Sequence, residues 1–266
     1  MKAGIKQELE KLYKGFDFKG AIGRDPVFFP KKYRDRKDVE VSAFIASAFA
    51  YGRIECFMPV VDNVLSAMGK SPFSFLMDFD AKKKANAFYG INYRFNRNED
   101  IVCLVHNLSE VLKKYGSIEN AFMACHKNAH KDIIPALSGF VDIALSFDTS
   151  PVYGKNVRPS GLLQFFPSPE KGSACKRSNL FLRWMIRDRD VDFGLWKGIP
   201  KDRLIIPLDV HVGSVSRKIG LTKRIANDLK TAVEITESLR GINPEDPLKY
   251  DFPLCHTGMS RRRDKC

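Results

Sequence analysis

Apolar residues recur at helical spacing along most of this chain, and this periodicity constrains the fold more than any other feature of the sequence. The clearest segment is residues 98–115, where Ile, Leu and Val return every three or four positions and Gly116 follows as a C-cap. Similar patterns cover residues 57–68 and residues 38–50, where Asp38 is the expected N-cap. The alternation of apolar and polar residues that is typical of strands forms no series. The sequence therefore predicts an all-α fold.

Further helical segments lie on both sides of a long connection rich in Pro and Gly. Residues 117–147 have a helical pattern in at least two pieces, which divide near Pro135. The connection, residues 148–172, contains four Pro and three Gly, so we expect it to be non-helical; long loops in compact domains are often functional. Helical patterns then return, around a mixed insert at residues 187–208, in segments 173–187, 210–219, 224–241 and from Pro247 onward.

The domain organisation that we expect is one unit spanning residues 1–266 and built from two helical lobes with a cleft between them. A chain of 266 residues is long enough for one sizeable core or for two small lobes that share one. The first lobe is expected at about residues 38–147 and the second at about residues 160–266, with residues 1–37 packing on the second.

The net charge is the first functional signal. Lys and Arg number 44 against 31 Asp and Glu, which gives a formal charge of +13 at pH 7. A balance this basic favours a polyanionic partner, because Lys and Arg that contact phosphates release condensed counterions. Charge alone leaves the ribosome, RNA and DNA open as partners.

The cellular compartment follows from two further patterns. No apolar run approaches the roughly 20 residues that a membrane-spanning helix needs. Charges interrupt the first 16 residues, which have a helical rather than a signal-peptide pattern (Ile5, Leu9, Leu12 and Phe16). We therefore expect a cytoplasmic, nucleoid-associated monomer without a membrane partner.

The six Cys residues are scattered and form no CxxC pair. Their spacing offers neither a zinc site nor an iron–sulfur cluster, so we expect no cofactor and no metal. The group Cys125, His126 and His130 is better explained as a solvated helix face beside lysines than as a metal site.

Two short segments carry the residues on which a function can be based. In the first, a Pro- and Gly-containing turn leads through Gly172-Ser-Ala-Cys-Lys176 into a helical pattern. A helix N-terminus presents unpaired N–H groups and the positive end of the dipole, which favours phosphate binding. In the second, Pro207-Leu-Asp209-Val-His211-Val follows an apolar stretch and opens another helical pattern, so Asp209 is an expected N-cap.

These two segments resemble the helix-hairpin-helix DNA glycosylase superfamily, which includes endonuclease III and 8-oxoguanine glycosylase. In that superfamily a Gly-rich hairpin leads into a helix with a catalytic Lys, and a later V-D-x-H-V stretch holds a catalytic Asp; Lys176 and Asp209 match these positions. The second hairpin Gly is replaced by Ala174, and the cluster cysteines of endonuclease III have no counterpart. Over most of its length the chain is similar to an uncharacterised prokaryotic family, domain of unknown function 2400, grouped near these enzymes.

The resemblance implies base-excision repair of double-stranded DNA by a bifunctional glycosylase and AP lyase. Excision leaves an oxocarbenium-like sugar, which a carboxylate such as that of Asp209 stabilises. A primary amine, here that of Lys176, attacks C1′ and forms a Schiff base that permits strand cleavage. The interval between the two residues is similar to that of archaeal 8-oxoguanine glycosylases, which favours an oxidised purine as the damaged base.

Further residues are expected to support DNA binding. Around the hairpin these are Lys171, Gly172, Ser173 and Arg177, with His211 as a second phosphate contact or a local cap.

The superfamily fills the gap left by an extruded base with a side chain from an early helix junction. Here Tyr51 would enter the gap and Arg53 would contact the orphaned base, although Tyr51 is equally compatible with a core position. Trp184 and Trp196 are candidates for stacking on the extruded base, with a core position as the alternative for Trp184. The basic segment 261–265 either adds nonspecific DNA affinity or is a frayed end.

Two other functions stay open from the sequence. A noncatalytic protein could keep the same fold for binding DNA or RNA, and a monofunctional glycosylase could use Asp209 with water in place of the Lys amine.

Overall fold

The computed structural model describes residues 2–263, with side chains for residues 4–259, and within this range the chain is helical and forms no β-strand. The all-α prediction is therefore confirmed. The chain divides into two compact units. The terminal unit contains the residues up to Gly23, residues 130–134 and the residues from Pro169 onward, and the middle unit contains residues 24–129 and 135–168.

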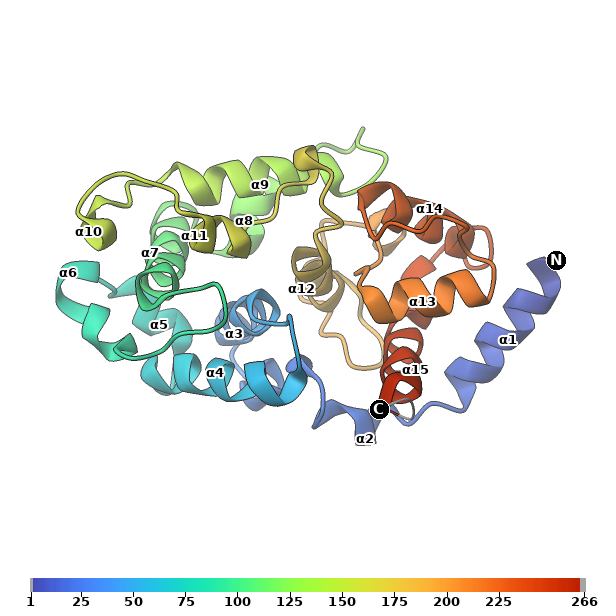
Figure 1. The fold of residues 1–266 in the computed structure, drawn as a ribbon. Coiled ribbons are helices and arrows are strands. Elements are labelled where there is room, and N and C mark those ends of the chain that lie inside the picture. Colours follow the sequence, from blue (N-terminus) through green and yellow to red (C-terminus); the bar gives the residue numbers. More distant parts are fainter. Residues whose placement is uncertain (1, 264–266) are drawn as a thin grey trace. The chain divides into compact units, whose positions relative to one another are not determined.

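The middle unit is arranged around a long buried helix, α7 (Asn98–Tyr115), which Gly116 ends in a left-handed conformation as the sequence predicted. Helices α5 and α11 contact α7, and α3 contacts α5 (Figure 1). The helices of this unit are α3 (Arg36–Ala48), α4 (Ile54–Ala67), α5 (Pro72–Met77), α6 (Ala81–Lys84), α7, α8 (Ile118–Met123), α9 (Ile134–Ser146, which begins at the boundary), α10 (Ser150–Tyr153) and α11 (Ser160–Phe165).

Buried carboxylates on α3 hold the starts of two other helices. Asp38 accepts hydrogen bonds from the Ser71 hydroxyl at 2.8 Å and from the Phe73 N–H at 2.9 Å, at the N-terminus of α5. Glu40 accepts hydrogen bonds from the Ile118 and Glu119 N–H groups at 2.9 Å each, at the N-terminus of α8. A charged acceptor at a helix N-terminus satisfies unpaired donors and the helix dipole together.

The predicted cap of α3 was wrong by one turn. The N-cap is Asp35, whose carboxylate accepts hydrogen bonds from the Lys37 and Asp38 N–H groups, and Asp38 lies inside the helix. Two acidic residues at helical spacing both suit the start of a helix. In the structure Asp35 caps α3, and the Asp38 carboxylate binds the start of α5 instead.

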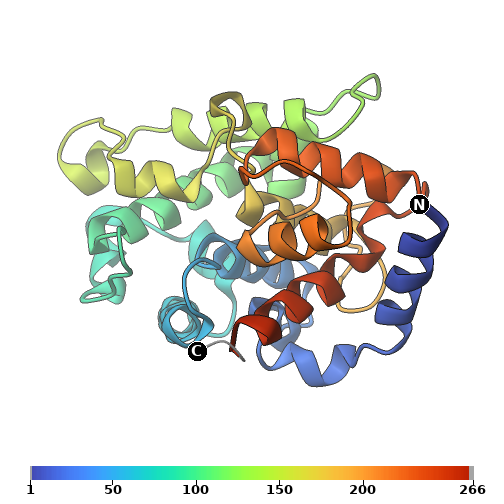
Figure 2. The same ribbon diagram turned by 45° about the vertical axis from the view of Figure 1, so that its right-hand side comes forward.

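The terminal unit contains the N-terminal helices and the four longer helices that follow the Pro- and Gly-rich connection. Helix α13 (Val210–Lys218) packs along α15 (Asp251–Arg263), and the two are side by side in both views (Figures 1 and 2). The other helices of this unit are α1 (Lys2–Lys14), α2 (Phe18–Ile22), α12 (Lys176–Ile186) and α14 (Leu229–Arg240).

The connection at residues 148–172 is less irregular than its composition predicts. It contains α10, α11 and a single 3₁₀ turn at Pro169–Lys171. Pro151 lies in the first turn of α10, and Pro159 is the N-cap of α11. Pro is tolerated at both positions because the first turn of a helix needs no intrahelical N–H donor.

The close contact of α13 with α15 depends on Gly258. A Cβ atom at this position would lie 2.9 Å from the carbonyl oxygen of His211 and 2.9 Å from its Cβ. Gly4, in α1, is also helical, but no atom lies within 4 Å of the Cβ it would gain. The two glycines therefore offer a matched pair of helical Gly→Ala substitutions.

We expect Gly258→Ala to lower the free energy of unfolding by about 1–3 kcal/mol, because the added methyl group meets backbone atoms that must move. The matched Gly4→Ala change should instead raise it, by up to about 1 kcal/mol, through helix propensity. Chemical denaturation of both variants measures the difference. Equal stabilisation by the two substitutions would contradict the close α13–α15 contact.

Candidate functional site

The turn that precedes α12 has an unusual backbone conformation. Gly172 and Cys175 both have positive φ values, 75° and 46°. The Gly172 N–H donates to the Pro169 carbonyl at 2.8 Å, and its carbonyl accepts from the Leu229 N–H at 3.0 Å, which ties the turn to the start of α14. A non-Gly residue in the left-handed region is strained and often marks a functional site. Helix α12 begins directly afterwards, at Lys176.

Asp209 lies at the start of α13, as the sequence predicted. The preceding Leu204–Leu208 segment is buried, and its Ile206 N–H donates to the Thr236 hydroxyl at 3.0 Å. Asp209 then caps α13, because its Oδ1 accepts the N–H groups of His211 and Val212 at 2.9 Å each. Capping through one carboxylate oxygen leaves Oδ2 directed elsewhere.

The structure brings Lys176 and Asp209 together. Lys176 Nζ lies 4.0 Å from Asp209 Oδ2, and their side chains are 27% and 19% exposed. An amine and a carboxylate are thus adjacent at the N-termini of two helices, partly screened from water but accessible. This arrangement can hold an anion, transfer a proton, or support attack by the amine on an electrophilic carbon.

Helix α15 contributes residues that the sequence analysis missed. Cys255 Sγ lies 3.9 Å from Asp209 Oδ2, and Asp251, one turn earlier on α15, interacts electrostatically with Asp209. No motif indicated these residues. The only signal was the helical spacing of Asp251, Cys255 and Gly258, which places them on one face of the helix.

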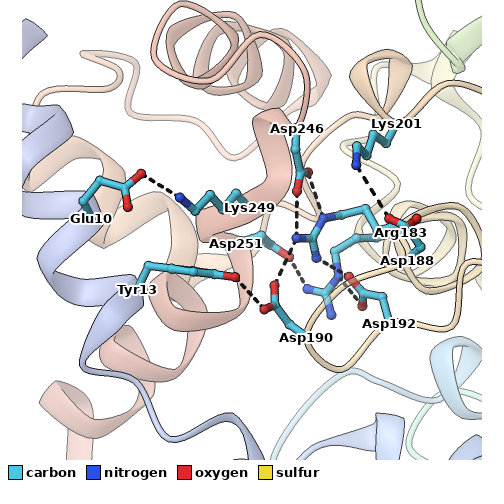
Figure 3. Close-up of polar contacts among 11 residues, drawn as sticks. Glu10, Tyr13, Arg183, Asp188, Asp190, Asp192, Lys201, Asp246, Lys249 and Asp251 are labelled. Carbon is cyan, nitrogen blue, oxygen red and sulfur yellow. Dashed lines mark hydrogen bonds and ion pairs between the residues drawn. The ribbon is translucent and has the colours of Figure 1, made fainter.

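A buried ion network fixes the other end of α12 (Figure 3). Arg183 donates from Nε to Asp192 at 3.2 Å and from Nη1 to Asp251. Arg187 binds Asp246 through two hydrogen bonds of 2.8 and 2.9 Å, and it also contacts Asp192. Both arginine side chains are only 2% exposed.

The network extends to the N-terminal helix through Asp190. Arg187 Nη2 donates to Asp190 at 3.1 Å, and the Tyr13 hydroxyl of α1 donates to the same carboxylate at 2.6 Å. Burial and the hydrogen bond to Asp190 raise the pKa of Tyr13 to about 12. Four separate parts of the terminal unit therefore meet around two guanidinium groups: α1, the loop after α12, the segment before α15 that contains Asp246, and the start of α15.

Asp251 is a member of this network with one carboxylate oxygen that lacks a described hydrogen bond. Its Oδ1 has no hydrogen-bond partner among the residues that the structure describes. Burial raises the pKa of Asp251 to about 6, against the opposing effect of Arg183, and the carboxylates of Asp209 and Asp192 raise it further. A proton on Asp251 relieves the excess of carboxylates over guanidinium groups in this interior.

The remaining predicted hairpin residues lie close to Lys176 along the chain. Ser173 accepts a hydrogen bond from the Cys175 N–H at 3.2 Å, Lys171 is exposed, and Arg177 is half-buried in the first turn of α12. His211 is half-buried in the first turn of α13.

The two tryptophans do not offer the stacking faces that the sequence analysis proposed. Trp184 is fully buried, and Trp196 is 2% exposed with its ring edge-on to Phe181 at 5.4 Å. The core position that was the alternative for Trp184 is the one observed. The backbone N–H of Trp196 donates to the Met185 carbonyl at 2.8 Å, which ties the insert to α12.

Tyr51 and Arg53 belong to the middle unit. Arg53 is exposed and is the N-cap residue of α4. Tyr51 is half-buried, and its hydroxyl donates to the Tyr93 carbonyl at 3.2 Å and contacts Asn96 Oδ1. These contacts hold the Tyr51 ring against the protein, so insertion into DNA would require it to leave them.

Three remaining features concern metal binding, membranes and the C-terminal segment. Among the residues described, no three His, Cys, Asp or Glu side chains form a group that could hold a metal ion. Over the same range, the helices are too short or too polar to cross a membrane. The basic segment 261–265 lies beyond residue 259, where the described side chains end.

We expect Asp251→Asn to change how stability depends on pH. Because the folded-state pKa of Asp251 is raised to about 6 from 3.8, the folded protein retains a proton that the unfolded chain releases between about pH 4 and 6. Asp251 therefore lowers stability as pH rises through this window, by on the order of 3 kcal/mol. Denaturation at pH 4, 5, 6 and 7 measures the free energy of unfolding of both proteins. The value for Asp251→Asn should rise relative to that of the native protein as pH rises. A difference in the free energy of unfolding that is the same at all four pH values would contradict the raised pKa of Asp251.

A family model matches most of the chain. No curated protein and no solved structure matches the chain. The sequence model of a family described as a protein of unknown function, DUF2400, matches residues 25–260, which include Lys176, Asp209 and the buried ion network except for Tyr13. The chain therefore belongs to the DUF2400 family.

Proposed function

We propose that this protein is a DNA glycosylase with AP-lyase activity, in which Lys176 is the nucleophile and Asp209 assists. The observation that carries the proposal is the distance of 4.0 Å between Lys176 Nζ and Asp209 Oδ2. Two residues well separated in the sequence, identified there by resemblance to the helix-hairpin-helix glycosylases, are adjacent at the starts of two helices. An accidental resemblance would not require them to meet.

The proposed reaction uses each group for a different step. Asp209 stabilises the positive charge that develops on the sugar as the bond between C1′ and the base nitrogen breaks, and the base leaves with the electron pair. Lys176 Nζ gives one proton to the adjacent carboxylate or to water, forms a bond to C1′ with its free electron pair, and then gives up a second proton. The C1′–O4′ bond then opens, O4′ takes a proton, and the nitrogen lone pair forms the C1′=N iminium. Loss of a proton from C2′ forms the C2′–C3′ double bond as the C3′–O bond breaks, and the phosphate leaves with that electron pair.

The surroundings of Lys176 suit the DNA backbone. The N-terminus of α12 presents N–H groups and the positive end of the helix dipole, and Lys171 and Arg177 lie next to it in the sequence. A net charge of +13 favours a long polyanion over a small acidic substrate.

The identity of the damaged base is proposed from resemblance alone. The interval between Lys176 and Asp209 is similar to that of 8-oxoguanine glycosylases, so we propose an oxidised purine. Trp196 is buried and gives this choice no support. Matched duplexes that carry 8-oxoguanine, thymine glycol, uracil or an abasic site test it, and preference for either pyrimidine lesion would contradict it.

We expect Lys176→Gln to abolish the covalent adduct that borohydride traps between the native protein and lesion-containing duplex, because Gln has no amine that can form an iminium. Lys201→Gln is the matched control. Lys201 is 30% exposed and lies 3.6 Å from Asp188 in the same unit, so it is a comparable Lys–Asp pair away from Asp209. The control should trap as well as the native protein, and gel electrophoresis of the adduct measures both.

The trapping result also separates the alternative functions. Persistence of the adduct in Lys176→Gln would contradict the assignment and move it to Lys171. Base release without an adduct in the native protein would indicate a monofunctional glycosylase that uses water. Tight DNA binding without base release or an adduct would indicate a noncatalytic binding protein.

We expect Asp209→Asn to lower the excision rate by about 10²–10⁴-fold with a stability cost below about 1 kcal/mol, because Asn still caps a helix but cannot stabilise the sugar cation. The control is Asp228→Asn, since Asp228 caps α14 by accepting the Thr231 N–H at 2.8 Å. Single-turnover kinetics and thermal unfolding measure the two effects. Equal loss of activity in both variants would show that capping, not the carboxylate, is what matters.

A further inference from the structure

A tight turn in the middle unit exposes an aromatic ring that no function so far described uses. The turn runs from Tyr93 to Asn96, with the N–H of each donating to the carbonyl of the other at 2.9 and 2.8 Å. Its two central residues are Arg94 and Phe95, and Phe95 is 67% exposed. A single exposed phenyl ring is common on protein surfaces, and Phe95 is distinguished by the hydrogen-bonded turn that holds it and by the Arg94 guanidinium beside it.

The turn is rigid rather than loosely attached. Asn96 is 1% exposed and donates from Nδ2 to the Gly161 carbonyl at 2.6 Å. The Tyr93 hydroxyl donates to the Tyr51 carbonyl, and the Tyr51 hydroxyl returns a hydrogen bond of 3.2 Å to the Tyr93 carbonyl. These bonds join the turn to the α3–α4 junction and to α11, so the exposed ring is held in a defined position.

Arg94 adopts a strained conformation that supports the ring. Its φ of 52° is in the left-handed region, which a two-residue hairpin usually assigns to Gly. Its guanidinium carbon lies 5.5 Å from the Phe95 ring centre and 5.9 Å from that of Tyr51. Gly52 makes room for this arrangement, because a Cβ there would lie 2.6 Å from both Arg94 Nη1 and the Tyr93 hydroxyl oxygen.

We propose that Phe95, supported by Arg94, is a stacking surface for an unpaired base of DNA. The inference rests on the proposed function for its partner, a polyanion that carries aromatic bases. A rigid exposed ring with a guanidinium beside it combines the two contacts that proteins use for unpaired bases, stacking and a nearby cation for the backbone. The inference places the stacking contact on Phe95 instead of Tyr51, because the Tyr51 hydroxyl is hydrogen-bonded to this same turn while the Phe95 ring is open to solvent.

The experiment measures binding of the full chain to two duplexes that differ only in whether one 2-aminopurine base is paired or unpaired. We expect the native protein to bind the unpaired-base duplex more tightly and to quench its emission by stacking. Phe95→Ala should weaken binding to that duplex by about tenfold or more and remove most of the quenching, with little change for the paired duplex. Phe95→Trp should retain both effects, because a larger ring still stacks.

Two further variants control for folding and for general aromatic contacts. Phe28→Ala removes another partly exposed Phe of the middle unit, 37% exposed with Lys32 Nζ 4.7 Å from its ring centre, and should leave both duplexes unaffected. Arg94→Gly suits the positive φ and removes only the side chain, so it should fold normally and lose part of the quenching. Thermal unfolding of each variant confirms that the turn is intact.

The outcomes separate this inference from the proposed function. If folded Phe95→Ala protein loses the same affinity for both duplexes, or loses none, the stacking role is overturned, even if Lys176 still forms the trapped adduct. A Phe95-dependent preference for the unpaired base supports the stacking role even if no excision occurs. A native protein that binds neither duplex overturns both proposals.

Discussion

The buried ion network around Arg183 and Arg187 is the constraint on which the terminal unit depends. Isolated charges in an interior are very costly, so the two guanidinium groups must stay in contact with their carboxylates. These carboxylates come from the loop after α12, from Asp246 in the segment before α15 and from the start of α15, and Asp190 links them to Tyr13 of α1. Rotation or translation of α12 would leave several of these charges unpaired. The network therefore sets the orientation of α12 about its own axis.

This orientation determines the environment of Lys176. Arg183 lies two helical turns after Lys176, so both side chains project from the same face of α12. The face that meets Asp192 and Asp251 at one end meets Asp209 at the other. Helix α15 completes the link, because Asp251 belongs to the network while Cys255, one turn later, contacts Asp209. The candidate site and the most strongly buried charges of the unit thus form one structure rather than two.

The middle unit shows how tertiary contacts change the surroundings of a residue that the sequence singles out, here Tyr51. The junction between α3 and α4 was identified correctly as a helix boundary that contains Gly52, and Tyr51 was the aromatic residue nearest to it in the sequence. The Tyr93–Asn96 turn folds back onto the same junction through the hydroxyl groups of Tyr51 and Tyr93. That contact joins residues about forty positions apart, and it leaves Phe95 exposed next to the junction in place of Tyr51.

Local sequence patterns were sufficient to predict the all-α fold, the bounds of α7 and the positions of Lys176 and Asp209 at helix starts, because periodicity, Gly and cap residues act within a few positions of one another. They did not determine which of Asp35 and Asp38 caps α3, the short helices of the Pro-rich connection, or the burial of both tryptophans. These points depend on tertiary contacts. The same is true of the 4.0 Å distance between Lys176 Nζ and Asp209 Oδ2 and of the electrostatic interaction between Asp209 and Asp251. Each depends on which residues from distant parts of the chain pack together, since burial and pairing change the free energy of a side chain far more than its neighbours in sequence do.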